Sequence, residues 1–158
     1  MEKKEMVYFD DLGKYLRFER DKRMSDCHIY MMWRVAEYLR NSRAFRNAGG
    51  VQVSFVAIPD LKTDYNYPDL YCGLFDVECE TGLKHHYGDL KQRILNNPKS
   101  VIVVLPNQEV LKRYKKNCNV RKTHLFFCTL ETFPKTLTNV LRPIQDKIKR
   151  DKKKHQLR

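Results

Sequence analysis

The sequence lacks every cysteine pattern by which proteins usually hold structural zinc. It contains five cysteines in 158 residues, with no Cys-x-x-Cys pair and no Cys and His set at zinc-finger spacing. The count is odd, and Cys79 and Cys128 lie inside apolar runs, which is typical of reduced thiols buried as small hydrophobic side chains. We therefore expect no structural zinc and a reducing compartment.

Long hydrophobic runs are also absent. No stretch approaches the roughly 18 apolar residues of a membrane span, and no apolar region follows the charged residues 1–5. The sequence has no glycine-rich phosphate loop, no dinucleotide-binding fingerprint and no internal repeat. These absences predict a soluble, intracellular, cytoplasmic protein with no membrane partner.

Acidic residues are few compared with basic ones. The chain has 19 Asp and Glu against 31 Lys and Arg, which gives a formal net charge of +12. This excess is larger than solubility requires, and it favours a polyanionic partner, of which nucleic acid is the usual one. A solvated basic surface would give the same count, so the charge raises the expectation of nucleic-acid binding without proving it.

The apolar periodicity predicts one α/β domain over residues 1–146, followed by a basic extension at 147–158. With 42% hydrophobic residues, the chain can bury a core without disulfides. From residue 27 the predicted order is one helix, three strands, a helix, a strand, a helix, a strand and a helix. The continuous β-branched run at 100–105 indicates a strand buried on both faces of a mixed or parallel sheet.

One predicted strand carries alternating carboxylates. Side chains two apart share a face of a strand, so Asp76, Glu78 and Glu80 should face opposite to the apolar Val77 and Cys79. Three carboxylates on one face repel one another unless a divalent metal or basic groups compensate. The strand is therefore a metal-site candidate, with a solvated acidic edge strand as the alternative.

The order of these elements and two short motifs resemble the PD-(D/E)xK nuclease superfamily, which has the restriction-endonuclease-like fold. The resemblance covers roughly residues 27–105, with Pro68-Asp69 as the first half-motif and Glu78-Cys79-Glu80 as the second. It implies a mixed central sheet flanked by helices, in which Asp69 and Glu78 would ligate Mg²⁺ or Mn²⁺. Glu37 matches an acidic residue that many members place near the metal.

The second half-motif carries glutamate where the family usually has lysine, as some restriction enzymes do. By the resemblance, Glu80 would orient or deprotonate the attacking water, and a basic group could come from Lys84 or from Lys91, with Lys84 preferred. The predicted function is a metal-dependent deoxyribonuclease. The alternative is a non-catalytic nucleic-acid-binding protein on a degenerate nuclease fold, because the usual lysine is missing.

Several residues outside the motifs are candidates for nucleic-acid contacts. Tyr65 and Tyr67 lie in a polar loop and could stack on bases. Basic residues that could contact phosphates are Lys91, Lys112, Arg113, Lys115, Lys116, Lys152, Lys153 and Lys154. The aromatic residues Tyr8, Phe9, Tyr15 and Phe18 lie outside the expected core, and they would either form a homodimer interface or fold back on their own domain.

Overall fold

The structure is a computed structural model that describes residues 6–11, 14–19, 26–50, 54–55, 69–82, 87–118, 120–122 and 124–156. It is a mixed α/β fold, as predicted. The helices are α1 (Asp26–Asn41), α2 (Arg43–Asn47), α3 (Tyr87–Asn96), α4 (Gln108–Asn117) and α5 (Phe133–Gln156). The strands are β1 (Met6–Asp11), β2 (Lys14–Glu19), β3 (Ser54–Phe55), β4 (Leu70–Tyr71), β5 (Asp76–Cys79), β6 (Val101–Leu105) and β7 (Leu125–Thr129).

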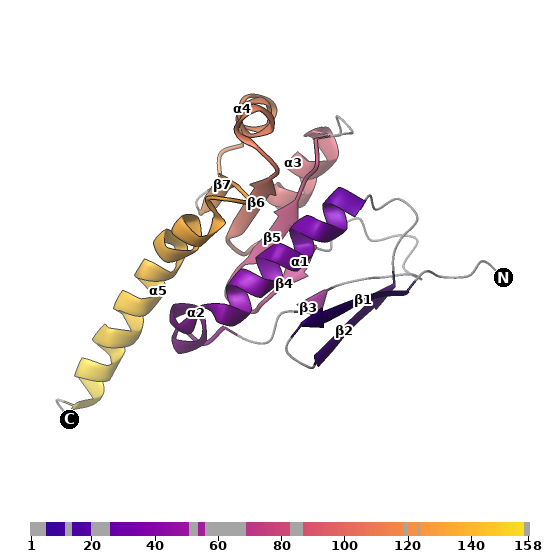
Figure 1. Ribbon diagram of the computed structural model, residues 1–158. Coiled ribbons are helices and arrows are strands. Elements are labelled where there is room, and N and C mark those ends of the chain that lie inside the picture. The colour runs from indigo at the N-terminus through magenta and orange to yellow at the C-terminus, as the bar shows by residue number, and fades with distance from the viewer. Residues whose placement is uncertain are drawn as a thin grey trace.

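The central sheet has five strands in the order β3-β4-β5-β6-β7. The first three form an antiparallel meander, whereas β6 and β7 run parallel to β5. Each parallel pair is joined by a helix, α3 between β5 and β6 and α4 between β6 and β7, because parallel neighbours need a long crossover. The prediction of a mixed sheet flanked by helices is confirmed, and the predicted order of elements from α1 to α5 is found (Figure 1).

Three elements were not predicted, namely β1, β2 and the short helix α2. Strands β1 and β2 form an antiparallel hairpin over residues that the sequence pattern left unassigned, with Met6 paired with Glu19 and Asp11 with Lys14. The side chains of this hairpin lie outside what the structure describes, so the aromatic dimer prediction stays a prediction. The short helix α2 follows α1 directly, because the Ser42 hydroxyl accepts a hydrogen bond from the Phe45 amide and starts a new helix.

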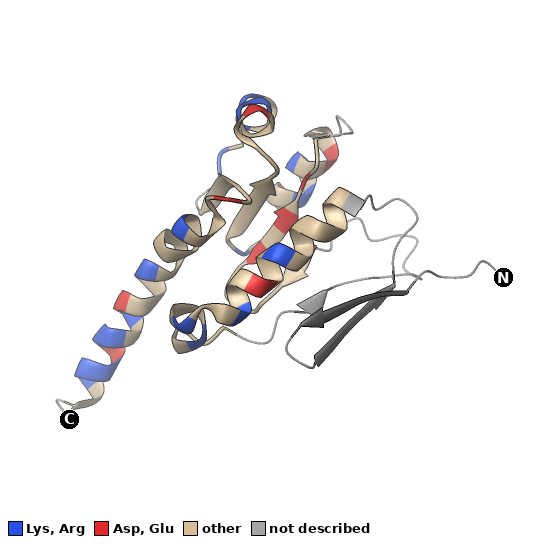
Figure 2. Ribbon diagram, in the orientation of Figure 1, with Lys and Arg blue, Asp and Glu red and all other residues tan. Residues whose placement is uncertain are grey.

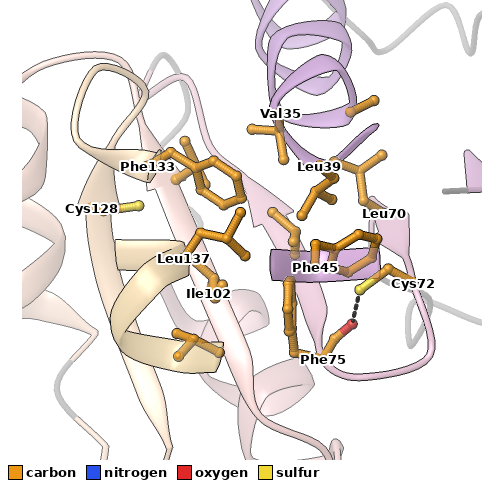
Figure 3. Close-up of a cluster of buried hydrophobic side chains, with 14 of the residues drawn as sticks. Val35, Leu39, Phe45, Leu70, Cys72, Phe75, Ile102, Cys128, Phe133 and Leu137 are labelled. Carbon is orange, nitrogen blue, oxygen red and sulfur yellow. Dashed lines mark hydrogen bonds between the residues drawn. The ribbon is translucent and has the colours of Figure 1, made fainter. Parts of the chain in front are cut away.

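One face of the sheet is covered by α1, α2 and the first half of α5. This first core cluster joins Val77 and Cys79 of β5 with Ile102 and Val104 of β6. Phe45 of α2 meets Phe75 edge-on at 6.1 Å, and Leu39, Leu70, Phe133 and Leu137 surround them (Figure 3). The thiol of Cys72 donates a hydrogen bond to the Phe75 carbonyl at 3.1 Å, which closes the turn between β4 and β5.

The opposite face is covered by α3 and α4. Leu90 and Ile94 of α3, with Val110, Leu111 and Tyr114 of α4, pack against the odd-numbered residues of β6. All five residues of β6 are buried, as the β-branched run predicted. Cys72, Cys79, Cys118 and Cys128 are buried free thiols, and Cys27 is an exposed one.

Helix α5 continues into the predicted basic extension. Residues 147–158 were expected to follow the domain as an extension, but the helix reaches Gln156, with exposed side chains throughout 149–156. Figure 1 shows its final turns extending away from the sheet. In the part of the chain that is described, no helix combines the length and apolar character needed to cross a membrane.

Candidate active site

Asp69 anchors a cluster of charged residues at the start of β4. Its Oδ2 accepts a hydrogen bond from the Cys79 amide at 2.7 Å, which ties the beginning of β4 to the end of β5. The same oxygen lies 3.1 Å from Nε2 of His28, in the first turn of α1. Both side chains are largely buried, with 15% of Asp69 and 19% of His28 exposed. The Asp69 carboxylate is therefore held in place by β5, through the Cys79 amide, and by α1, through His28.

Glu78 and Glu80 lie on the face of β5 that α3 covers. The Arg93 guanidinium of α3 lies 3.6 Å from Oε2 of Glu78 and donates a hydrogen bond to Oε1 of Glu80 at 3.0 Å. Val77 and Cys79 enter the opposite core cluster, so the predicted alternation along β5 is confirmed. Arg93 therefore bridges two carboxylates that would otherwise repel one another.

Glu78 and Glu80 bind protons more tightly than usual. Burial raises the pKa of Glu78 well above its ordinary value, and the nearby Asp69 raises it further, while Arg93 lowers it. Burial and the Asp69 charge likewise raise the pKa of Glu80 to about 6. Burial lowers the pKa of His28, but the charge of Asp69 and the hydrogen bond to it outweigh burial and raise it overall. The cluster is thus short of positive charge.

The sequence analysis missed His28 and Arg93. No motif marks His28, since a single histidine near the start of a helix resembles many structural ones. Arg93 gives a weak signal, because it follows the buried Leu90 by three residues and so lies on nearly the same side of α3. That side faces the predicted acidic strand, where an arginine would find partners. The basic groups that we preferred were instead Lys84 and Lys91.

Glu37, the predicted acidic residue of the first helix, lies about two and a half turns from His28 along α1. Its Oε2 accepts a hydrogen bond from the Arg34 guanidinium at 2.8 Å. The charges that act on the pKa of Glu78 come from Asp69, Arg93, Glu80 and Asp76. His28 is thus the α1 residue in contact with Asp69, and the catalytic role of Glu37 stays a prediction.

The remaining predicted residues are distributed over several elements. Tyr65, Tyr67 and Lys84 lie outside the described residues. Lys91 is a partly exposed residue of α3, and the α4 cluster comprises exposed Lys112, Lys115 and Lys116 with half-buried Arg113. Lys152, Lys153 and Lys154 are exposed near the end of α5. Figure 2 shows Lys and Arg on α4 and along the final turns of α5, and further ones on α1, α2 and α3.

Asp76, at the start of β5, belongs to a separate polar group. Its Oδ2 accepts a hydrogen bond from the Asn97 side-chain amide at 2.6 Å, and no described residue hydrogen-bonds to its buried Oδ1. It lines a cavity of about 250 Å³ together with Arg93, Asn96, Asn97, Pro98 and Lys99. Arg93 links this cavity to the pair of Glu78 and Glu80, so the acidic face of β5 opens towards the end of α3.

The donor atoms of the cluster suit a hard divalent cation, because Mg²⁺ and Mn²⁺ prefer carboxylate oxygens. The pKa of Glu78 is raised because the positive charge of Arg93 does not fully offset burial and the neighbouring carboxylates. A bound cation would supply the missing positive charge. The side chains as they stand are not a finished coordination sphere. Across the residues that the structure describes, no three His, Cys, Asp or Glu side chains are already arranged to hold a metal ion. Binding would require Arg93 to move from Glu78 or Glu80.

Comparison with known proteins gives no independent guide to this site. No protein-family model matches the chain, and neither a curated protein nor a solved structure matches it.

Proposed function

We propose that this protein is a metal-dependent nuclease that hydrolyses phosphodiester bonds in DNA. The observation that carries the proposal is the convergence of Asp69, Glu78 and Glu80 on one side of the β4 and β5 pair, with protonation of Glu78 and Glu80 favoured by burial and mutual repulsion. The net charge of +12 over the whole chain supports the choice of substrate, because a basic protein attracts the phosphate backbone.

The arrangement of elements supports the restriction-endonuclease-like fold as part of this proposal. A helix, an antiparallel three-stranded meander, a helix and a strand parallel to the third strand follow one another from α1 to β6. Asp69 directly precedes the second strand of the meander, and Glu78 lies on the third. Asp69 and Glu78 are thus brought together by adjacent strands of the meander.

In this proposal Asp69 and Glu78 hold Mg²⁺ or Mn²⁺, which would supply positive charge to the scissile phosphate and acidify a bound water. Glu80, with a pKa of about 6, is mostly ionised at neutral pH and can accept the proton of the attacking water. His28 holds Asp69 in place through its Nε2. Arg93 supplies the positive charge that the missing lysine would supply. Its guanidinium lies between Glu78 and Glu80 and can move to a phosphate oxygen.

The test is cleavage of linear, circular and single-stranded DNA by the purified chain with Mg²⁺ or Mn²⁺. Glu78→Gln should abolish cleavage and leave the circular dichroism spectrum unchanged. Glu109→Gln is the matched control, because Glu109 is an exposed residue of α4 and should be indifferent. Undiminished cleavage by Glu78→Gln would show that the activity lies elsewhere.

A second candidate function is DNA binding without catalysis. The observation that favours it is the Arg93 guanidinium, which already occupies the space between Glu78 and Glu80 as a structural cation would. Titration with Mn²⁺ separates the two functions, since a nuclease should bind the ion and lose it on Asp69→Ala. A purely DNA-binding chain should show no Mn²⁺ binding and should keep its DNA affinity in that variant.

A further inference from the structure

Residues 147–156, which we call the projecting half of α5, are long enough to lie in a groove of DNA and form no apolar face. The ten residues 147–156 span about 15 Å as a helix, and all those from 149 onwards are exposed. The first half of the same helix is anchored by Phe133, Leu137, Val140 and Leu141, which are buried in the core. The helix continues through Pro143, so its buried first half carries the exposed second half into solvent.

The basic residues of this half cover one broad side of the helix. Successive residues turn by about 100°, so the basic side chains span an arc of about 220°, and Ile148, Asp151 and His155 lie on the remaining side. They are Lys147, Lys149, Arg150, Lys152, Lys153 and Lys154. Asp151 is the one acidic residue among positions 147–156. Figure 2 shows the blue bands on this part of α5.

This distribution distinguishes between possible anionic surfaces. A helix that lies on a flat anionic surface needs positive charge on one side only. The major groove of B-DNA is about 12 Å wide, admits an α-helix and has phosphates along both walls. A basic arc of about 220° can face the floor and both walls of the groove, so it fits the groove better than a flat surface. The deep, narrow major groove of duplex RNA cannot take such a helix.

The charges also repel one another along the free helix. Lys149 and Lys153 are four residues apart, as are Arg150 and Lys154, and like charges at this spacing destabilise a helix. Phosphates on both sides would relieve this repulsion, so DNA should strengthen the helix that it binds.

We infer that residues 147–156 of α5 form a docking helix that enters the major groove of duplex DNA. The inference rests on the proposed function for the choice of DNA, and it adds the element and the groove through which the protein holds its substrate. Because binding can be measured without metal, the docking helix and the nuclease activity can fail independently.

The first experiment measures the affinity of the full chain for duplex DNA, duplex RNA and single-stranded DNA in EDTA over a range of salt. One variant replaces Lys149, Lys152, Lys153 and Lys154 with Gln. A matched variant replaces Arg43, Arg46, Arg121 and Lys135 with Gln, because these exposed basic residues belong to other parts of the chain and are not among the candidate phosphate contacts. The α5 variant should lose affinity selectively for duplex DNA and flatten its logarithmic salt slope by about two to four units, close to one per lost phosphate contact. Equal losses on all three nucleic acids, or equal flattening by the matched variant, would overturn the inference.

A second variant separates helix from charge. Ile148→Pro interrupts the helix and keeps every basic residue, with Ile148→Ala as its control. Groove docking predicts that Ile148→Pro binds duplex DNA at least about tenfold more weakly, whereas Ile148→Ala binds normally. Unchanged binding by Ile148→Pro would mean that an unstructured basic tail suffices and that the groove assignment is wrong.

Discussion

The two faces of the central sheet differ in the size of their apolar core and in their polar content, and the larger core lies on the face covered by α1, α2 and α5. On the face covered by α1, α2 and α5, β5 contributes Val77 and Cys79 to an apolar cluster. On the face covered by α3 and α4, the same strand contributes Asp76 and Glu78, both only 5% exposed. Buried carboxylates are costly unless they are compensated, so the second face gives up stability that the first face retains.

This difference teaches where function can be placed in a small α/β domain. The apolar face provides the packing that holds β4 and β5 together, through Leu70, Phe75 and Val77 (Figure 3). The polar face is then able to hold like charges close together, because the strands that carry them cannot separate. Arg93 and Asn97, both at or beyond the end of α3, supply only part of the compensation.

Adding a carboxylate on the apolar face of β5, one residue from Glu78, should have the largest effect on stability. Val77→Asp places a charge in the first core cluster, where Val77 is fully buried among apolar side chains. We expect the free energy of unfolding to fall by more than about 4 kcal/mol, since a buried charge without a partner is among the most destabilising changes. Glu78→Gln should instead raise stability at neutral pH. Urea denaturation measures both, and a well-tolerated Val77→Asp would contradict the asymmetry of the two faces.

Removing the bridging cation should have the next largest effect. Arg93→Met leaves Glu78 and Glu80 without their shared partner, and the free energy of unfolding should fall by about 2–3 kcal/mol, because a quarter of the Arg93 side chain is exposed and water screens part of the charge. Mn²⁺ should then restore more stability to the variant than it adds to the parent. Arg34→Met is the control, since it breaks a more exposed ion pair with Glu37 and should cost less than about 1 kcal/mol.

The polar face should also make stability depend on pH. Glu80 binds its proton more tightly in the folded chain, so stability is higher below about pH 4.5 and falls as pH rises towards 6, by about 2 kcal/mol. The raised pKa values of Glu78 and His28 act in the same direction, and the part from His28 is lost above its usual pKa. Thermal melts from pH 4.5 to 8 measure the loss. Glu80→Gln should flatten the curve, and stability that rises across this range in the parent would contradict the assignment.

The group at the start of β5 should have the smallest effect of the four. Asn97→Ala removes the donor to Asp76 and the side-chain acceptor of the Lys99 amide, which should cost about 1–2 kcal/mol. Mn²⁺ affinity should not change, because Asn97 touches neither Asp69 nor Glu78 in the described contacts. Asn96→Ala, at an exposed neighbour, is the control. A large loss of Mn²⁺ binding in Asn97→Ala would show that the Asp76 group and the acidic cluster form one site.

Much of the fold follows from local patterns in the sequence. The alternation of Asp76, Val77, Glu78 and Cys79 predicted which side chains share a face, because the period of a strand is two whatever surrounds it. The β-branched run predicted that β6 is buried on both faces, and the apolar stripe predicted α3. The β1 and β2 hairpin was missed because its aromatic and charged residues match neither a helical nor a strand period clearly.

The sequence by itself determined the carboxylates, their shared face and the basic surplus, because each depends only on residue type and local spacing. The tertiary structure alone decided which cations meet them. His28 lies 41 residues before Asp69, and Arg93 lies on the helix that crosses back over β5, so their contacts depend on chain reversals that no local pattern records. It also decided that α5 continues to Gln156, since a run of like charges predicts fraying unless the helix is already nucleated by packing of its first half.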